Sequence, residues 1–359
     1  MRNFLIVFAA ATLFSGCHST DSEVDGDIQR GQRSRRQALT VEEISRVKMS
    51  RVRSAASVGN SVFVAQVLDG MTLVNLAEPS QPKVVRRFAP EEIQPLDMVA
   101  DGKELLMADR FRGLVIWDVS TPDAPTSLSA LALPGIATGI TLTRKPDGRR
   151  LAAMACGSAG LQMVDVTNST APRLLGGFAR GIDYAREVST FFDLAYLADN
   201  ADGGIKLLDA TNPEAPQLVA QWNHAGFCES VQGDEHNVVT AWRTGGVAVY
   251  GRTMGSRSRG PLPEFPIHRT FTVYRSRSYA HDALIPSHGN QTPEYRPLLA
   301  VADGGAGVVF YDIMNGRLPV KVAEIETGGD TTSLVEHGPL LLACCWDAGL
   351  VVLKLKSGD

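Results

Sequence analysis

A short pattern recurs seven times along this chain of 359 residues. Each copy has a glycine, then a run of apolar residues and, in most copies, an aspartate or asparagine that ends the run. The glycines are Gly70, Gly113, Gly160, Gly204, Gly246, Gly307 and Gly349, and successive ones lie 43, 47, 44, 42, 61 and 42 residues apart. A period of this length indicates a repeat architecture in which each unit is one supersecondary element.

Each unit has the pattern of four β-strands. One apolar run precedes the glycine and another follows it, and the Asp- and Gly-rich residues between them favour a hairpin turn. After the second run, a segment such as Asp118–Pro125 has the composition of a turn, and a more amphipathic run follows it. The middle runs are apolar at consecutive positions, for example at Leu114–Trp117, which is typical of strands that are buried on both faces.

These features predict an all-β fold, a seven-bladed β-propeller of four-stranded antiparallel blades over residues 41–359. A β-sandwich or two small β domains are the alternatives, but neither requires so regular a period. The seventh unit ends without an outer strand, so we expect the N-terminal segment Ile44–Arg51 to pair with residues 350–355 and complete this last blade, closing the ring. Thr40 and Glu43 have the spacing of a capping box, a competing signal that would start a short helix before that strand. We expect any such helix to end by about Arg46, where the strand takes over.

The segment Gly113–Pro122, Gly-Leu-Val-Ile-Trp-Asp-Val-Ser-Thr-Pro, resembles the LVIVD repeat of bacterial surface and secreted proteins. The resemblance covers roughly residues 52–356 and is weak in the fifth and sixth units. It implies a β-propeller fold, and it implies no defined catalytic activity.

Residues 1–16 have the pattern of an export signal, with one basic residue, an apolar stretch from Phe4 to Phe14 and small residues after it. The sequence Phe-Ser-Gly-Cys that ends at Cys17 resembles the bacterial lipobox, with Phe14 where Leu is usual. This resemblance implies a lipidated Cys17, and His18 in place of Asp after it implies the outer membrane or cell surface. An ordinary export signal with an incidental cysteine is the alternative. Residues 17–40 would then form the lipidated cysteine and a flexible tether, since almost no apolar side chain follows Cys17 there.

Composition argues against nucleic acid as a partner, because 35 basic against 39 acidic residues give a net charge of −4 and no strongly basic domain. Beyond Cys17 there are four cysteines without the spacing of a metal site, and they are Cys156, Cys228, Cys344 and Cys345. We expect buried thiols there, with disulfide bridges as the alternative.

Polar residues occur near the predicted starts of the innermost strands, where they would face a central channel. They are Asp97, Thr138, Arg186, Glu187, Glu229, His281, Asp282 and Thr332. A carboxylate–His cluster at the channel could bind a divalent cation or serve in acid–base catalysis. Opposed pairs such as Arg186 and Glu229 could instead satisfy one another. The usual catalytic motifs (HExxH, GxSxG, a phosphate loop) do not occur in the sequence.

Two segments depart from the repeat, at residues 253–267 and 286–297. Departures from a repeat often carry function, so we expect a partner-binding rim there. Its predicted residues are Arg257, Arg259, Phe265, His268, His288 and Tyr295. The alternative is a tolerated surface insertion.

Taken as a sequence alone, the chain favours a membrane-anchored, extracytoplasmic propeller that binds or scaffolds a protein or an envelope glycan. We expect no cofactor and favour a non-enzymatic role. The alternative is a metal-dependent hydrolase or lyase whose site lies at the central channel and uses a divalent cation.

Overall fold

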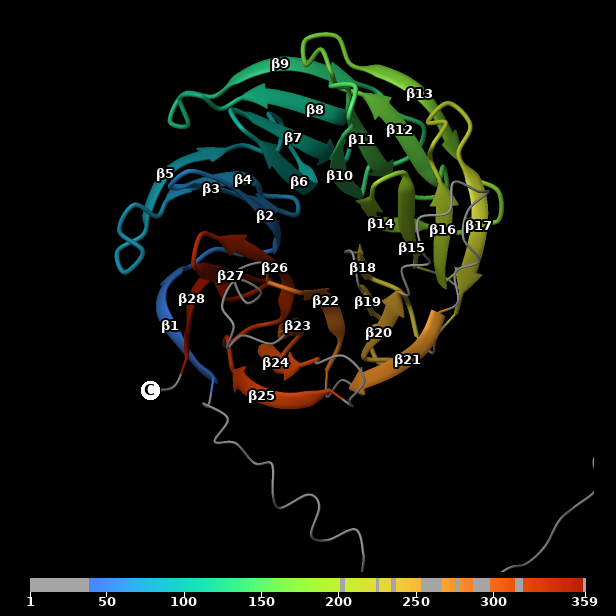
Figure 1. The fold of residues 1–359 in the computed structure, drawn as a ribbon. Coiled ribbons are helices and arrows are strands. Elements are labelled where there is room, and N and C mark those ends of the chain that lie inside the picture. Colours follow the sequence, from blue (N-terminus) through green and yellow to red (C-terminus); the bar gives the residue numbers. More distant parts are fainter. Residues whose placement is uncertain are drawn as a thin grey trace, which may run out of the picture. The chain divides into compact units, whose positions relative to one another are not determined.

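The structure is a computed structural model. It describes residues 39–200, 204–223, 226–233, 237–252, 267–274, 278–286, 298–313 and 319–357, with the backbone alone for 251–252, 267–274 and 357. The described residues form seven antiparallel sheets of four strands each, arranged in a ring in Figure 1. The predicted seven-bladed β-propeller is therefore confirmed. Within these residues we find no helix that is long and apolar enough to cross a membrane.

In six blades the strands follow one another in chain order from the centre of the ring outwards, and in the seventh β1 (Leu39–Val47) takes the outer place. The inner strands are β2 (Val52–Val58), β6 (Pro95–Asp101), β10 (Gly139–Arg144), β14 (Ala185–Phe191), β18 (Ser230–Gly233), β22 (Ala280–Leu284) and β26 (Thr331–His337). The second strands are β3 (Ser61–Gln66), β7 (Glu104–Asp109), β11 (Arg150–Ala155), β15 (Leu194–Asp199), β19 (Asn237–Ala241), β23 (Leu298–Asp303) and β27 (Leu340–Cys345).

The third and fourth strands complete blades 1 to 7, which we number from the inner strand β2. The third strands are β4 (Gly70–Asn75), β8 (Gly113–Asp118), β12 (Leu161–Asp165), β16 (Gly204–Asp209), β20 (Val247–Arg252), β24 (Val308–Asp312) and β28 (Gly349–Ser357). The outer strands are β5 (Lys83–Phe88), β9 (Thr126–Leu131), β13 (Arg173–Phe178), β17 (Gln217–Trp222), β21 (Ile267–Tyr274), β25 (Val320–Ile325) and, in blade 7, β1 (Leu39–Val47).

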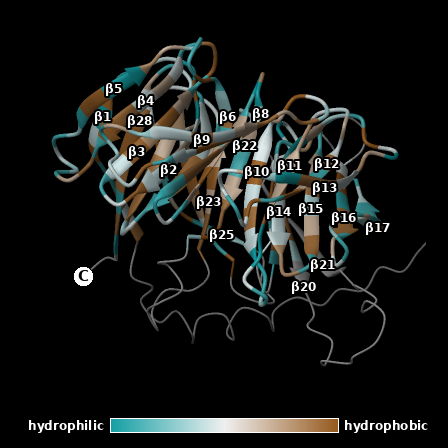
Figure 2. Ribbon diagram, turned by 90° about the horizontal axis from the view of Figure 1, so that it is seen from above, coloured by the Kyte–Doolittle hydropathy of each residue, from teal (hydrophilic) through white to brown (hydrophobic). Residues whose placement is uncertain are grey.

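The core lies between the blades. The second and third strands are buried on both faces, as their consecutive apolar residues predict; in blade 2, Leu105–Asp109 and Gly113–Trp117 are buried throughout. Each hydrophobic cluster of the described residues joins two consecutive blades, and the one between blades 7 and 1 contains Val47, Val64 and Leu342. The outer strands are more polar, and Figure 2 colours much of β5 and β17 as hydrophilic. The blades therefore hold one another by apolar packing.

The repeat glycines adopt a backbone conformation that other residues rarely take. Gly113 and Gly349 have φ angles of 79° and 92°. A Cβ atom at Gly113 would lie 2.5 Å from the carbonyl oxygen of Leu131, and one at Gly349 would lie 2.1 Å from that of Val47. Each of these glycines thus permits both the tight turn and the close approach of the outer strand.

The ring closes through the N-terminal strand, as predicted. β1 pairs with β28 in an antiparallel register from Leu39 with Ser357 to Val47 with Leu350. The strand occupies residues 39–47, upstream of the predicted Ile44–Arg51, and so begins two residues before the predicted start of the propeller. Because Val47 contacts Gly349 as the outer strands contact the other repeat glycines, β1 replaces the missing fourth strand of blade 7.

The capping-box signal at Thr40 and Glu43 does not start a helix, because both residues lie in β1. Glu43 does not cap a helix; its carboxylate accepts two hydrogen bonds from Arg46, at 2.9 and 2.7 Å, across a bulge in the strand. The unpaired edge of β28 offers a full ladder of backbone hydrogen bonds, which outweighs the local preference of a capping box.

The prediction of buried thiols is confirmed for all four described cysteines. Cys156, Cys228, Cys344 and Cys345 are buried and free. Burial raises the pKa of the Cys156 thiol to about 12, so this thiol stays protonated at neutral pH.

Candidate functional site

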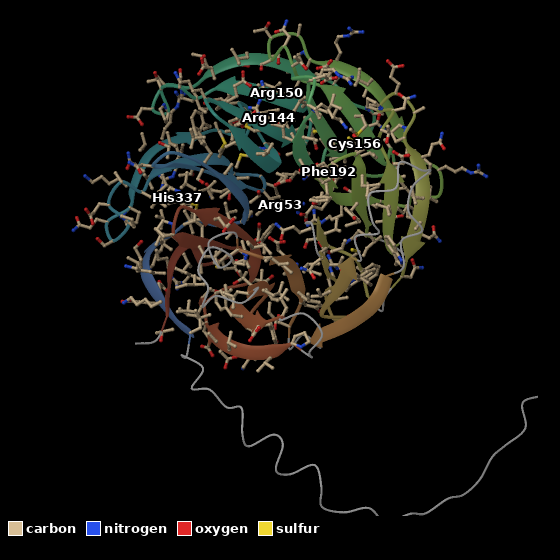
Figure 3. All side chains as sticks on the ribbon, viewed as in Figure 1. Arg53, Arg144, Arg150, Cys156, Phe192 and His337 are labelled. Carbon is tan, nitrogen blue, oxygen red and sulfur yellow. The ribbon has the colours of Figure 1, made fainter. Side chains whose placement is uncertain are left out.

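The inner strands deliver side chains to the centre of the ring through β-bulges. In five of them the register shifts after the first residue, and the extra residues are Arg53, Leu96, Arg186, His281 and Thr332. A bulge redirects the side chain of its extra residue. All five line a pocket of about 180 Å³ at the central channel, and Figure 3 shows Arg53 beside the centre of the ring.

The six residues predicted to lie at the channel all line this one pocket: Asp97, Arg186, Glu187, Glu229, His281 and Asp282. Thr138 and Thr332 line it too. Sequence reasoning missed Arg53, Arg243, Asp330 and Trp346, which also line the pocket. Arg53 follows the first residue of its inner strand, as Arg186 does, so the repeat register could have identified it.

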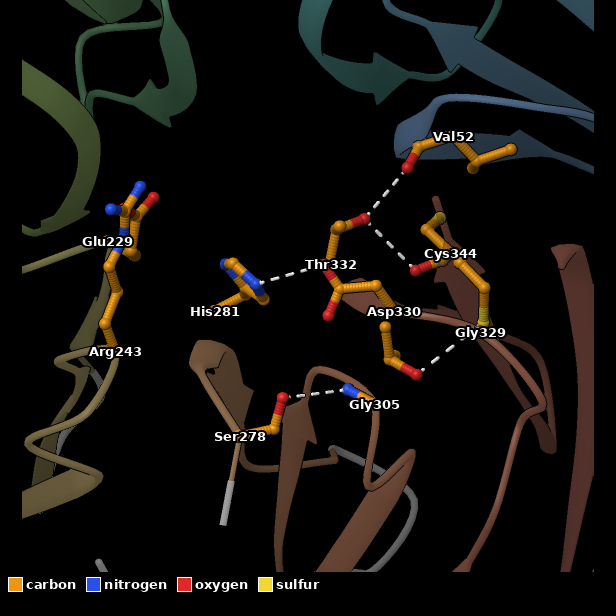
Figure 4. A network of polar contacts seen from close by, with 12 residues as sticks. Val52, Glu229, Arg243, Ser278, His281, Gly305, Gly329, Asp330, Thr332 and Cys344 are labelled. Atoms are coloured by element: carbon orange, nitrogen blue, oxygen red, sulfur yellow. Dashed lines mark hydrogen bonds and ion pairs between the residues drawn. The ribbon is translucent and has the colours of Figure 1, made fainter. Parts of the chain in front are cut away.

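Glu229 is the centre of a buried ion-pair cluster. Its Oε2 accepts a hydrogen bond from Arg186 Nε at 2.9 Å, and its Oε1 accepts from Asn200 Nδ2 at 2.9 Å and from Arg243 Nε. Its side chain is only 2% exposed, and Figure 4 shows it beside Arg243. Burial alone would raise the pKa of Glu229, but Arg186 and Arg243 outweigh it and lower the pKa to about 2. The pairing of Arg186 with Glu229 that the sequence suggested is therefore present.

Removing the Glu229 charge should make stability less dependent on pH. The pKa of Glu229 falls from an ordinary 4.5 to about 2 on folding, so its contribution is complete above pH 4.5 and is lost as pH falls towards 2. At pH 6 the free energy of unfolding of the parent should therefore exceed that of Glu229→Gln. At pH 3 this difference should be smaller by roughly 2 kcal/mol. Urea titrations across this range measure the difference, with the exposed Glu214→Gln as control. A gap that stays constant with pH would contradict this assignment.

Asp97 and Asp282 each link their own blade to the next one. Asp97 accepts hydrogen bonds from Ser54 Oγ at 2.8 Å and from the Ile140 amide at 2.9 Å. Asp282 accepts from Ser333 Oγ at 3.1 Å and from the Leu334 amide at 3.0 Å. In both cases the carboxylate satisfies a backbone N–H on the inner strand of the following blade. These two carboxylates, like that of Glu229, are thus already engaged within the protein.

His281 and Thr332 both line the pocket, and Figure 4 shows the contact of His281 with Asp330 as a dashed line. The Nε2 atom of His281 is 3.6 Å from Asp330 Oδ2 and is buried without a hydrogen-bond partner among the described residues. Burial lowers the pKa of His281, although Asp330 acts in the opposite direction. Thr332 Oγ1 lies 2.9 Å from the Val52 carbonyl oxygen and 3.1 Å from that of Cys344, which links blades 7 and 1.

A metal site is not apparent in the part of the chain that the structure describes, where no three His, Cys, Asp or Glu side chains lie close enough together to hold an ion.

The two sides of the ring differ in their exposed apolar side chains. We call the side of the ring where the inner strands begin the mouth face. The turns between second and third strands lie on this side, and so do the connections that lead into the inner strands. Six of the twelve large exposed apolar side chains of the described residues lie there. They are Leu68, Phe111, Ile136, Tyr184, Phe227 and Tyr279.

On the opposite side, the described residues expose one large apolar side chain, Phe192, in the turn after β14. The other five lie on outer strands. A second pocket on the mouth face has a volume of about 370 Å³, and its wall includes Leu68, Pro90 and Phe111. Apart from those on the outer strands, the large exposed apolar side chains of the described residues thus lie mostly on the mouth face, six there against one on the opposite side.

The predicted partner-binding rim lies almost entirely outside the described residues. Arg257, Arg259, Phe265, His288 and Tyr295 belong to that undescribed part. His268 lies in β21, of which the structure describes the backbone. The rim therefore stays a prediction, as does lipidation at Cys17, which also lies outside the described residues.

Comparison with known proteins identifies the fold. No protein-family profile matches the sequence, and no curated protein matches it. Among solved structures, the chain is similar to the WD40 repeats of RRP9, with 14% identity and a TM-score of 0.64 over 89% of this chain and 99% of that one. It is also similar to Raptor from Chaetomium thermophilum, with 16% identity and a TM-score of 0.63 over 90% of this chain and 29% of that one. The computationally designed Ika8 protein matches 87% of this chain and 99% of its own, with 9% identity and a TM-score of 0.59. At these identities the likenesses show a β-propeller and nothing finer.

Proposed function

We propose that this chain is a membrane-anchored, extracytoplasmic binding module that holds a partner protein on its mouth face. The observation that carries the proposal is the difference between the two sides of the ring: among the described residues, six large exposed apolar side chains lie on the mouth face and one on the opposite side. An excess of exposed apolar side chains on one face is typical of interaction surfaces, and aromatic residues often contribute most of the binding free energy. The LVIVD-like segment Gly113–Pro122 supports placing the chain among bacterial surface and secreted propellers.

The binding surface is tested by substitutions matched for exposure. Phe111 on the mouth face is 73% exposed, and Phe192 on the opposite side is 74% exposed. Parent and Phe192→Ser should capture the same partner from detergent-solubilised envelope, whereas the double variant Phe111→Ser/Phe227→Ser should lose at least tenfold of it. Quantitative mass spectrometry of the captured material measures this. Equal loss from Phe192→Ser, or no partner above background with the parent, would contradict the proposal. Release of the partner by glycosidase treatment would instead identify an envelope glycan.

The membrane anchor is tested separately. Because the acyl chains on Cys17 would supply the attachment, Cys17→Ala should move the protein from the membrane to the soluble fraction. The propeller should keep its melting temperature, since Cys17 precedes the first described strand, β1. Fractionation followed by mass spectrometry of the N-terminal peptide measures both outcomes. Parent protein that is entirely soluble, with an unmodified Cys17, would refute the anchor.

A further inference from the structure

One carboxylate at the channel departs from the pattern that its neighbours follow. Glu187 comes directly after the bulge residue of β14, just as Asp97 and Asp282 come directly after the bulge residues of β6 and β22. The two aspartates each accept an amide hydrogen bond from the next blade. The equivalent donor for Glu187 is the Val231 amide in β18, yet no hydrogen bond among the described residues engages the Glu187 carboxylate.

Glutamate is one methylene group longer than aspartate, so its carboxylate takes a different position when the backbone positions are equivalent. All three side chains line the pocket. Glu187 is therefore a channel acid whose carboxylate accepts no hydrogen bond from the described residues; the same holds for Asp330, which lies 3.6 Å from His281 Nε2.

The charges of the pocket wall leave an excess of carboxylate. Among the described residues, three arginines and five carboxyl groups line it. Arg186 and Arg243 are both paired with Glu229, and Arg53 donates its Nε to the Leu96 carbonyl at 2.8 Å. Burial raises the pKa of Glu187 well above 4.5, and the nearby Asp282 and Asp97 raise it further, more than Arg186 and Arg53 lower it. A positive charge placed beside Glu187 would relieve this repulsion.

Other groups of the pocket suit the same kind of ligand. The buried Nε2 of His281 has no hydrogen-bond partner among the described residues and, when neutral, can accept one. Trp346 lines the pocket, and Phe227 and Tyr279 are exposed on the mouth face. Aromatic rings favour both a methylene chain and a cation close to them.

We infer that the pocket receives one lysine side chain of a partner protein, with Glu187 as the counter-ion of its ammonium group. This inference rests on the proposed function and specifies the chemistry of the partner. A volume of about 180 Å³ admits a single side chain and no folded segment. The compact ammonium, with three donors in different directions, matches oxygen and nitrogen acceptors around one point better than a planar guanidinium does.

The test uses three capped pentapeptides, Gly-Gly-X-Gly-Gly, in which X is lysine, norleucine or glutamate. Because Trp346 lines the pocket, its fluorescence reports occupancy. The lysine peptide should give a saturable change in the parent and bind at least tenfold more tightly than the norleucine peptide. Equal binding of the norleucine peptide, tighter binding of the glutamate peptide, no binding of any peptide, or full displacement by calcium chloride would each overturn the inference.

Two variants of one residue sharpen the result. Glu187→Gln keeps the shape and should weaken the lysine peptide at least tenfold, whereas Asp183→Asn, an exposed acid on the mouth face, should not. Glu187→Asp keeps the charge but should accept the Val231 amide, as Asp97 accepts that of Ile140; it should therefore also lose the peptide and raise the melting temperature. Unchanged binding by both Glu187 variants would refute the assigned role. If Glu187→Gln still captures the partner while Phe111→Ser/Phe227→Ser does not, the inference fails and the proposed function stands.

Discussion

Deleting residues 39–47 should destabilise the propeller by about 5 kcal/mol or more, a large part of the total stability of an ordinary domain. The deletion removes β1, whose Val47 is buried and whose Leu39, Val41 and Ile44 pack against the clusters on either side of blade 7. It also leaves the edge of β28 unpaired and breaks the closure of the ring. Equilibrium unfolding in urea measures the loss.

A matched control for this deletion lies in the same strand. Glu42 forms an exposed salt bridge with Lys356, and about half of each side chain is accessible to solvent. Glu42→Ala should therefore leave the urea midpoint of unfolding almost unchanged, because solvent screens an exposed ion pair. A deletion variant that melts within a degree or two of the parent would show that the ring does not depend on β1.

Gly349→Ala should destabilise the propeller much more than alanine at a glycine that has a similar backbone conformation but open space around it. Its Cβ atom would lie 2.1 Å from the Val47 carbonyl oxygen, so the closing strand must move. Gly59 has a similar left-handed backbone, with a φ angle of 56°, but a Cβ atom there would meet nothing within 4 Å. Gly59→Ala should cost about 1 kcal/mol for the backbone alone, and Gly349→Ala more than about 3 kcal/mol because displacement of β1 adds to it.

Thermal and urea unfolding of the two variants separate these terms. Equal losses for Gly59→Ala and Gly349→Ala would show that the contact with Val47 contributes nothing to closure. Gly349→Ala can also be made in the variant that lacks residues 39–47. If it then lowers the free energy of unfolding no further, the substitution and the deletion act on the same contact.

The sequence was informative about the blades because their constraints are local and repeated. The turn position that Gly113 occupies requires a positive φ angle, and the same position in the other units favours glycine for the same reason. The regular spacing of these glycines therefore predicted the fold. The ends of β1 were less predictable, since the capping-box pattern at Thr40 and Glu43 is a local preference that pairing with a distant strand overrides.

The residues of the channel also divide into those that the sequence predicted and those that it did not. The register of the inner strands predicted that Asp97, Glu187 and Asp282 share one pocket, because their positions repeat with the blades. Arg243 and Trp346 enter from turns between other strands, and that pairing of distant segments has no signal in the sequence. Asp97 and Asp282 accept amide hydrogen bonds from the next blade and Glu187 does not, a difference that depends on distances between blades and has no signal in the sequence.

The pairing of β1 with β28 also determines how the ring resists mechanical force. Leu39 lies opposite Ser357, so the two ends of this pair of strands are neighbours on the side away from the mouth face. Pulling these two ends apart would open the backbone hydrogen bonds one after another, as in a zipper, and would need little force. A pull on Leu39 against a load held at the mouth face acts along the strands instead, and it strains the whole ladder at once. The strand that closes the ring is thus weak against peeling and strong in shear.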